Sequence, residues 1–411
     1  MEKFFKLKEH GTDARTEVTA GITTFLAMVY ILAVNPSILS ATGMDSSAVF
    51  TATAISAAFA TLIMAFYANY PVALASGMGL NVYFAFSVCS PMARDGIQDP
   101  WKIALAAVLC EGIIFILLSF TNFREKLVND IPENLKYGIT AGIGLFIAIV
   151  GLKGAGIVIA DPSTLVTLGK LGSPQFVLAF IGLIVIAILN HYKVKGDILI
   201  GILVTWILGI IAQQTGWYHV DPTNGVNSLL PSFKGGFFPA KMNIFSFDFD
   251  WIGKHIIDFA IIVFSFLFVD IFDTVGTLIG VASKGNLLDE NGDLPRAKQA
   301  LLADALGTVA GACIGTSTVT SYVESSAGVA AGGRTGLTSL VTAVLFILSL
   351  FLSPIFLAIP GFATTPALLW VGLLMVSAIK NMKFDGDLAE VVSGFLAIVM
   401  MPFTYSIANG I

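Results

Sequence analysis

Residues 316–333 read TSTVTSYVESSAGVAAGG, a polar and glycine-rich stretch within a largely apolar sequence. It is crowded with hydroxyl side chains, carries the acid Glu324, and lies between two long apolar runs. A second broken stretch, PVALASGMGLNVYFAFSVCSP at 71–91, is interrupted by Gly77 and Gly79. Irregular backbone is tolerated at membrane depth only where protein buries it or where it lines a cavity. Both stretches therefore predict irregular elements buried inside a membrane protein.

The composition of the chain supports a membrane location. Of its 411 residues, 56% are hydrophobic and 12% are charged, whereas soluble domains carry about 25% charged residues. This excludes an ordinary soluble enzyme and a disordered chain, and the net charge of −5 argues against a nucleic-acid binder. The cysteines lie in separate apolar runs without a C-x-x-C spacing, so we expect neither a disulfide framework nor a metal site. The sequence predicts an all-α polytopic membrane protein.

Runs of about 17 to 25 apolar residues predict membrane-spanning helices in both halves of the chain. The two broken stretches follow two such helices in each half, so they are the third and tenth segments. Paired interruptions at corresponding positions are typical of transporters whose inverted repeats meet at the binding site; two packing loops without a ligand are the alternative. The predicted helices cover residues 16–40, 46–69, 101–123, 131–153, 174–192, 195–216, 250–282, 297–315, 336–359, 361–380 and 388–410.

The segment count predicts the domain organisation. Residues 1–15 form the N-terminal segment, 16–217 a first repeat of seven segments, 218–249 a connecting loop, and 250–411 a second repeat with six of the seven expected segments. The last helix is apparently missing, so we expect the coding DNA to continue past Ile411 with one more apolar run.

The distribution of positive charge predicts the orientation. With the N-terminus inside, fifteen of the 22 Lys and Arg residues fall on inside connections and seven fall outside. The positive-inside rule therefore places the N-terminus in the cytoplasm. The N-terminal segment mixes acids and bases and has no apolar core, so we do not expect it to be a signal peptide. We expect a multi-pass protein of the cell membrane, either a plasma or an inner membrane.

Ionisable side chains at membrane depth are costly and point to function. Asp270 and Asp273 are three residues apart, and Thr277 follows four residues later, so on a helix all three project from one face. No Lys or Arg lies in the centre of that run, so we expect at least one of the two carboxyl groups to hold a proton near neutral pH. Glu324 lies among hydroxyl groups that suit a polar solute. Asp273, Glu324 and Thr277 are predicted to bind the substrate, and Asp270, Asp273 and Glu324 to couple transport to protons.

Further polar candidates lie in the apolar runs. Asn81 can both donate and accept hydrogen bonds, and broken helix around Gly79 frees backbone groups, so this stretch suits a neutral heterocycle. For Glu111 and Asp304, a structural hydrogen bond between helices explains the residue at least as well as a ligand does. No GxxxxGK[ST] phosphate loop is present, so we expect transport driven by a proton gradient, without nucleotide or other cofactor.

Five motifs follow one another along the chain, namely GITTFLAMVYILAVNP at 21–36, ASGMGLNVYFAF at 75–86, FVDIFDTVGT at 268–277, LLADALGT at 301–308 and TSYVESSAGVAAGGRTGLTS at 320–339. Together they resemble the nucleobase–cation symporters (xanthine/uracil permease superfamily), and specifically the AzgA-like purine permeases. The resemblance implies seven plus seven inverted repeats divided into a core and a gate domain, with short strands leading into half-helices at the third and tenth segments. It also implies proton-coupled import of hypoxanthine, guanine and adenine.

The resemblance also implies roles for single residues. The acid of the eighth segment falls on Asp273, with Asp270 one turn earlier, and the acid of the tenth falls on Glu324. The polar residue of the third segment falls on Asn81. Uracil-type relatives have Glu and His where this chain has Asp273 and Thr277, so we expect a purine substrate rather than uracil or xanthine.

Two alternatives remain at this point. An anion carrier of the same architecture, such as a sulfate transporter, would favour basic side chains at the site, and the acids argue against it. A membrane-embedded enzyme using the carboxylate pair is the weaker alternative. The expected partners are the purine substrate, protons and the lipid bilayer, with no nucleic acid. The oligomeric state stays open, a homodimer included.

Overall fold

The computed structural model describes residues 2–119, 132–220, 229–233, 241–290, 294–407 and 410. The chain forms two compact units, and each draws on both halves of the sequence. The core unit comprises Met1–Ile131 and Pro239–Phe351, and the second unit comprises Pro132–Phe238 and Leu352–Ile411. This division agrees with the expected core and gate domains. The helix expected after Ile411 and residues 221–228 and 234–240 of the 218–249 connection lie outside the described residues.

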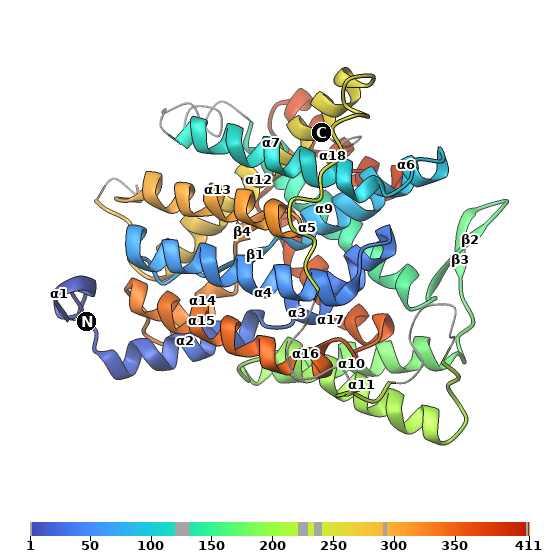
Figure 1. Cartoon of the computed structure of the whole chain (residues 1–411), viewed down its shortest axis with the longest axis horizontal. Helices are drawn as coiled ribbons and strands as arrows, with labels where there is room; N and C mark the ends of the chain where they lie inside the picture. Colours follow the sequence, from blue (N-terminus) through green and yellow to red (C-terminus); the bar gives the residue numbers. More distant parts are fainter. Residues whose placement is uncertain are drawn as a thin grey trace. The chain divides into compact units, whose positions relative to one another are not determined.

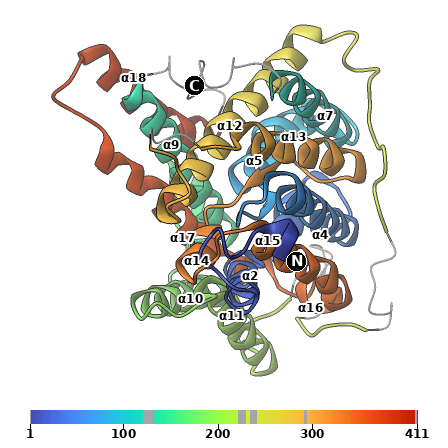
Figure 2. The same ribbon diagram turned by 90° about the vertical axis from the view of Figure 1, so that its left-hand side faces the viewer.

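The core unit is mainly helical and contains one short two-stranded sheet (Figure 1). Its elements are α1 (Glu2–Phe5), α2 (Ala14–Met28), α3 (Ile31–Leu39), η1 (Ser40–Thr42), α4 (Ser46–Ile63), η2 (Met64–Ala68), β1 (Leu74–Ser76), α5 (Met78–Val82), η3 (Tyr83–Cys89), α6 (Ser90–Arg94), α7 (Pro100–Ser119), α12 (Ile256–Lys284), α13 (Ala297–Ile314), β4 (Val319–Ser321), α14 (Ser325–Ala330) and α15 (Gly336–Ser349). Helix α13 packs against both α4 and α7, and α15 packs against α2 and α4 (Figure 2).

The second unit is built around α9, which packs along both α17 and α18. Its elements are α9 (Glu133–Gly154), β2 (Val158–Asp161), β3 (Leu165–Leu168), α10 (Pro174–His191), α11 (Asp197–Gln214), α16 (Ser353–Phe356), α17 (Gly361–Val376), η6 (Ser377–Asn381) and α18 (Leu388–Thr404), and η5 (Leu350–Leu352) lies at the boundary between the units.

The described helices confirm a multi-pass membrane protein. Eight helical stretches are long and apolar enough to cross a membrane, counted over the residues that the structure describes. Helix α12 has 29 residues, which at 1.5 Å per residue is about 43 Å and exceeds the bilayer core. The charged candidates Asp270 and Asp273 lie near its middle, whereas Asp258 is in its first turn with its side chain 65% exposed.

Close helix packing in the core unit depends on glycines. A Cβ atom at Gly328 in α14 would lie 2.7 Å from the Ala20 carbonyl oxygen in α2, and one at Gly21 would lie 2.6 Å from the Thr338 carbonyl oxygen in α15. Only glycine allows backbones to approach this closely, as is common between membrane helices. The short helix α14 is therefore held tightly against α2.

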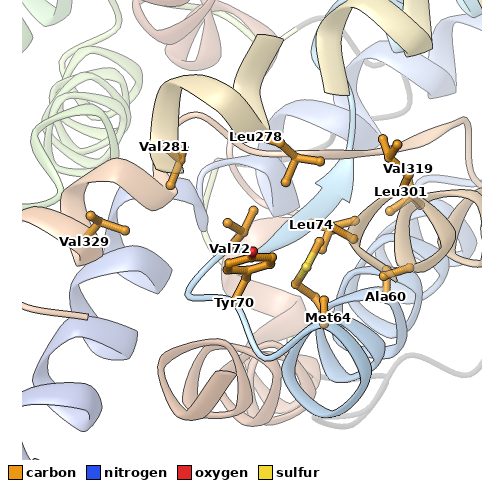
Figure 3. Packing of buried hydrophobic residues seen from close by; sticks show 13 residues of the cluster. Ala60, Met64, Tyr70, Val72, Leu74, Leu278, Val281, Leu301, Val319 and Val329 are labelled. Atoms are coloured by element: carbon orange, nitrogen blue, oxygen red, sulfur yellow. The ribbon is translucent and has the colours of Figure 1, made fainter. Parts of the chain in front are cut away.

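A hydrophobic cluster stabilises the crossing strands from one side. Figure 3 shows Met64, Tyr70 and Leu74 meeting Leu278 of α12 and Val319 of β4. All five residues are at least nine-tenths buried. Burying a large aliphatic side chain contributes roughly 1.5–3 kcal/mol, so this cluster fixes β1 and β4 against α12.

An ion pair holds the start of α4. The Asp45 carboxylate accepts hydrogen bonds from the backbone N–H groups of Ser47 and Ala48 and from the Lys241 ammonium at 2.9 Å. Burial opposes ionisation of Asp45, but these donors outweigh it and hold the pKa of the carboxyl below its ordinary value. The chain that leads towards α12 is thereby tied to the N-terminus of α4.

The structure corrects three details of the predicted segments. The expected helix 16–40 is broken at Val29 and Tyr30, and the helix expected from 250 begins at Ile256. The connection after α9, for which the sequence analysis made no prediction, forms a β-hairpin of β2 and β3. In its turn, the Asp161 carboxylate accepts from the backbone N–H groups of Ser163 and Thr164, which stabilises the reversal.

Candidate functional site

The two broken stretches meet as antiparallel strands. β1 pairs with β4 in a register that places Leu74 opposite Ser321 and Ser76 opposite Val319. Each strand leads within a few residues into a short helix, α5 or α14. The third and tenth segments are therefore strand and half-helix units, as the resemblance implied. The polar backbone of each stretch is satisfied by the other, which explains how irregular chain is tolerated inside the protein.

Side chains reinforce this crossing. The Tyr322 hydroxyl donates to the Ser76 carbonyl oxygen at 2.6 Å. The Thr316 hydroxyl lies 3.3 Å from the Ser76 hydroxyl, and the Asn35 amide donates to Thr316 at 2.9 Å. All four residues are buried. The hydroxyl groups of Thr316 and Tyr322 in the second broken stretch thus form hydrogen bonds to Ser76 in the first.

Asp273 and Glu324 form the centre of the candidate site. The Thr320 hydroxyl is hydrogen-bonded to the Asp273 carboxylate, and the charges of Asp273 and Glu324 interact. The Tyr30 hydroxyl donates to Glu324 Oε1 at 2.6 Å. Tyr30 and Thr320 are buried, whereas both carboxylates are half-buried. The structure therefore brings these two predicted residues together at partly exposed positions.

Asp270 belongs to a neighbouring, fully buried group. The Thr274 hydroxyl lies 3.3 Å from an Asp270 oxygen and 3.0 Å from an Asp304 oxygen, and the Ser321 hydroxyl lies 3.3 Å from Asp304. These contacts connect α12, α13 and β4.

Asn81 bonds to Ser76 of β1. The Ser76 hydroxyl donates to the Asn81 side-chain oxygen at 2.7 Å, and the Asn81 amide lies 3.4 Å from the Ser76 carbonyl oxygen. Asn81 is fully buried, whereas Gly79 is half-buried in the first turn of α5. The substrate contact expected of Asn81 remains a prediction, and the observed contacts place it as a support for the β1–α5 turn.

Thr277 and Glu111 are both buried. Thr277 is buried one turn after Asp273. Glu111 of α7 is fully buried and accepts from the Thr318 hydroxyl at 3.2 Å. Glu111 therefore connects α7 to the chain entering β4, in line with the structural role that the sequence allowed.

Sequence reasoning missed two residues of the site. Tyr30 lies in an apolar run, and Ser76 immediately precedes a glycine, so neither stands out. Their partners are 294 and 246 residues away, beyond any local pattern. Tyr322 was noted as one of many hydroxyls, but nothing in the sequence indicated that it bonds to β1.

Two known permeases are similar in sequence to this chain over nearly its whole length. Adenine permease AdeP of Escherichia coli is 46% identical over 411 residues, which is 100% of this chain and 88% of that protein. Guanine/hypoxanthine permease PbuO of Bacillus subtilis is 48% identical over 409 residues, which is 99% of this chain and 91% of that protein.

The transmembrane domain of the cyanobacterial bicarbonate transporter BicA has the same fold, with a TM-score of 0.71, 16% identity and coverage of 96% of this chain and 97% of that one. Residues 15–411 match the Permease family in its xanthine/uracil permease form. This chain therefore belongs to the xanthine/uracil permease family and is a transporter rather than an enzyme.

Proposed function

We propose that this chain imports purine nucleobases together with protons, with hypoxanthine and guanine as the main substrates and adenine as a further one. The observation that carries the proposal is the Asp273–Glu324 pair beside the strand crossing. The similarity to adenine and guanine/hypoxanthine permeases supports the substrate class.

The chemistry of the pair suits a purine. A purine edge presents ring N–H groups next to acceptor atoms, and an ionised carboxylate accepts from such a group in a charge-assisted hydrogen bond. Glu324 is already oriented by the Tyr30 hydroxyl, which reduces the entropy lost on binding. An anion carrier would need donors at this position, and two carboxylates repel an anion.

Proton coupling follows from the same pair. Two ionised carboxylates in a site that loses water on loading are costly, so proton binding should accompany substrate binding. We propose that Asp273, or Asp270 beside it, takes the proton and that Glu324 mainly holds the substrate. The proton gradient then supplies the driving force, and no cofactor is needed. The distribution of Lys and Arg supports a cell-membrane location with the N-terminus in the cytoplasm.

Uptake by cells that lack purine carriers tests the proposal. Labelled hypoxanthine should accumulate unaltered, faster as external pH falls from about 8 to 6, because the coupled proton is then more available. A protonophore should abolish accumulation. Excess guanine should compete, whereas uracil, sulfate and bicarbonate should not. Competition by sulfate or bicarbonate without competition by guanine would instead show an anion carrier.

The role of Asn81 can be tested in the same assay. We expect Asn81→Ala to raise the half-saturation concentration for hypoxanthine about 5- to 100-fold. A polar group of the bound substrate would then be buried without its hydrogen-bond partner, at a cost of about 1–3 kcal/mol. Membrane expression should match that of the parent. Unchanged half-saturation with normal uptake would reduce Asn81 to a packing residue.

A further inference from the structure

A basic pocket lies in the core unit, away from the carboxylate pair. It has a volume of about 200 Å³ and is formed by the N-terminal segment, the end of η2, the loop after α12 and the loop after α14. Arg296, Arg334 and His10 line it together with Asn69 and Tyr70. No acidic side chain occurs among the described residues that line it.

Arg296 offers most of its guanidinium to the pocket. Its side chain is exposed, and one guanidinium nitrogen lies 3.4 Å from the Ala68 carbonyl oxygen. Its backbone N–H donates to the Tyr70 hydroxyl at 3.2 Å. In the part of the chain that the structure describes, neither pocket arginine has a carboxylate oxygen within 4.0 Å of its guanidinium nitrogens. A guanidinium has five N–H donors, so Arg296 keeps several for a ligand.

Arg334 is held more rigidly. One of its terminal nitrogens donates to the carbonyl oxygens of Val329 and Gly333, both at 2.7 Å. Its backbone N–H donates to the Glu17 carboxylate at 2.8 Å. These bonds fix the guanidinium at the C-terminal end of α14 and leave its other nitrogens to bind an anion. A pre-positioned arginine loses little entropy when it binds a planar or tetrahedral oxyanion.

The floor of the pocket is apolar and fixed. Tyr70 lines the pocket and also belongs to the buried cluster with Met64, Val72 and Val281 (Figure 3). Charge–charge attraction is stronger beside such a low-dielectric floor than in open water. Two guanidinium groups that share a pocket without a carboxylate repel each other, and an anion between them relieves this repulsion.

We propose that this pocket binds a phosphate monoester. At pH 7 such a group carries a charge of about −1.5 to −2 and three strong acceptor oxygens, which match two arginines and the His10 side chain. The volume accommodates the phosphate and part of the group attached to it. The phosphate comes either from a soluble ligand, such as a nucleoside monophosphate, or from a lipid headgroup. The inference is independent of the proposed transport substrate.

Binding to the full chain in nanodiscs of phosphatidylcholine tests the proposal. Titration with inorganic phosphate, and then with a purine nucleoside monophosphate, should show saturable binding that weakens at high salt. Arg296→Gln should weaken binding at least tenfold while the melting temperature stays near that of the parent, because this side chain is exposed. Arg334→Gln should weaken it as well, although this change also removes the bonds to the end of α14.

Lys298→Gln is the matched control, because Lys298 is exposed in the first turn of α13, only two residues after Arg296, and does not line the pocket. It should bind phosphate like the parent. If nanodiscs containing phosphatidic acid suppress phosphate binding to the parent chain, and Arg296→Gln loses phosphatidic acid adducts in native mass spectrometry, the lipid headgroup is the ligand. Equal phosphate and phosphatidic acid binding by the parent and Arg296→Gln, or equal weakening by Lys298→Gln, would overturn the proposal.

Discussion

Asp273→Asn is expected to abolish the accumulation of hypoxanthine against its gradient. An amide has the shape of the carboxyl group but cannot bind and release a proton, so the variant has no means of coupling at this position. Labelled hypoxanthine should then only equilibrate across the membrane, and the rise in uptake between external pH 8 and 6 should disappear. Time courses of uptake at the two pH values, with and without a protonophore, measure this directly.

Asp258→Asn provides the control from the same helix. Asp258 is exposed near the start of α12, 3.4 Å from His255, so its loss should leave uptake unchanged. If Asp273→Asn still accumulated hypoxanthine against its gradient in a pH-dependent way, the proposed role of Asp273 in proton coupling would be wrong. The proton would then be carried elsewhere, and the Asp270–Thr274–Asp304 group would be the next place to look.

The second large effect is expected at Glu324. Glu324→Gln should raise the half-saturation concentration for hypoxanthine about 10- to 100-fold, because a hydrogen bond to a charged group contributes roughly 1.5–3 kcal/mol. The glutamine side-chain oxygen can still accept from the Tyr30 hydroxyl, which now donates at 2.6 Å, so the fold should persist. Concentration series of initial uptake rates give the value.

Two comparisons separate binding from coupling. At saturating hypoxanthine the Glu324→Gln variant should still respond to external pH, because Asp273 is intact. Glu9→Gln, on an exposed side chain paired with Lys6, should behave like the parent. An unchanged half-saturation concentration in Glu324→Gln would show that this carboxylate does not hold the substrate.

The helices were predictable because their signals are local. The run predicted at 297–315 is observed as α13, Ala297–Ile314. It ends where Gly315 adopts a φ of +97°, a conformation that glycine adopts without strain. The two interrupted segments were recognisable because their polar and glycine content conflicts with a lipid-facing helix. Asp273 and Glu324 stood out for the same reason, since charge at membrane depth is costly.

The contacts between these segments were not predictable. Asp270 and Thr274 are four residues apart, but that spacing does not reveal that Thr274 also bonds to Asp304, 30 residues later. The break at Tyr30 has no glycine or proline beside it, and it is stabilised by a partner in a distant segment. Asn81 was expected to face the substrate, and only the folded chain shows that its side chain contacts Ser76.

The strand crossing has a consequence for how the protein is made. The Tyr322 hydroxyl that bonds to Ser76 belongs to a residue synthesised 246 residues later, which at about 5–20 residues per second takes roughly 12–50 s. During that time β1 is already in the membrane without the strand that satisfies its backbone. The backbone polar groups of β1 therefore have no partner strand until β4 has been synthesised. In that interval a chaperone or the insertion machinery can shield them.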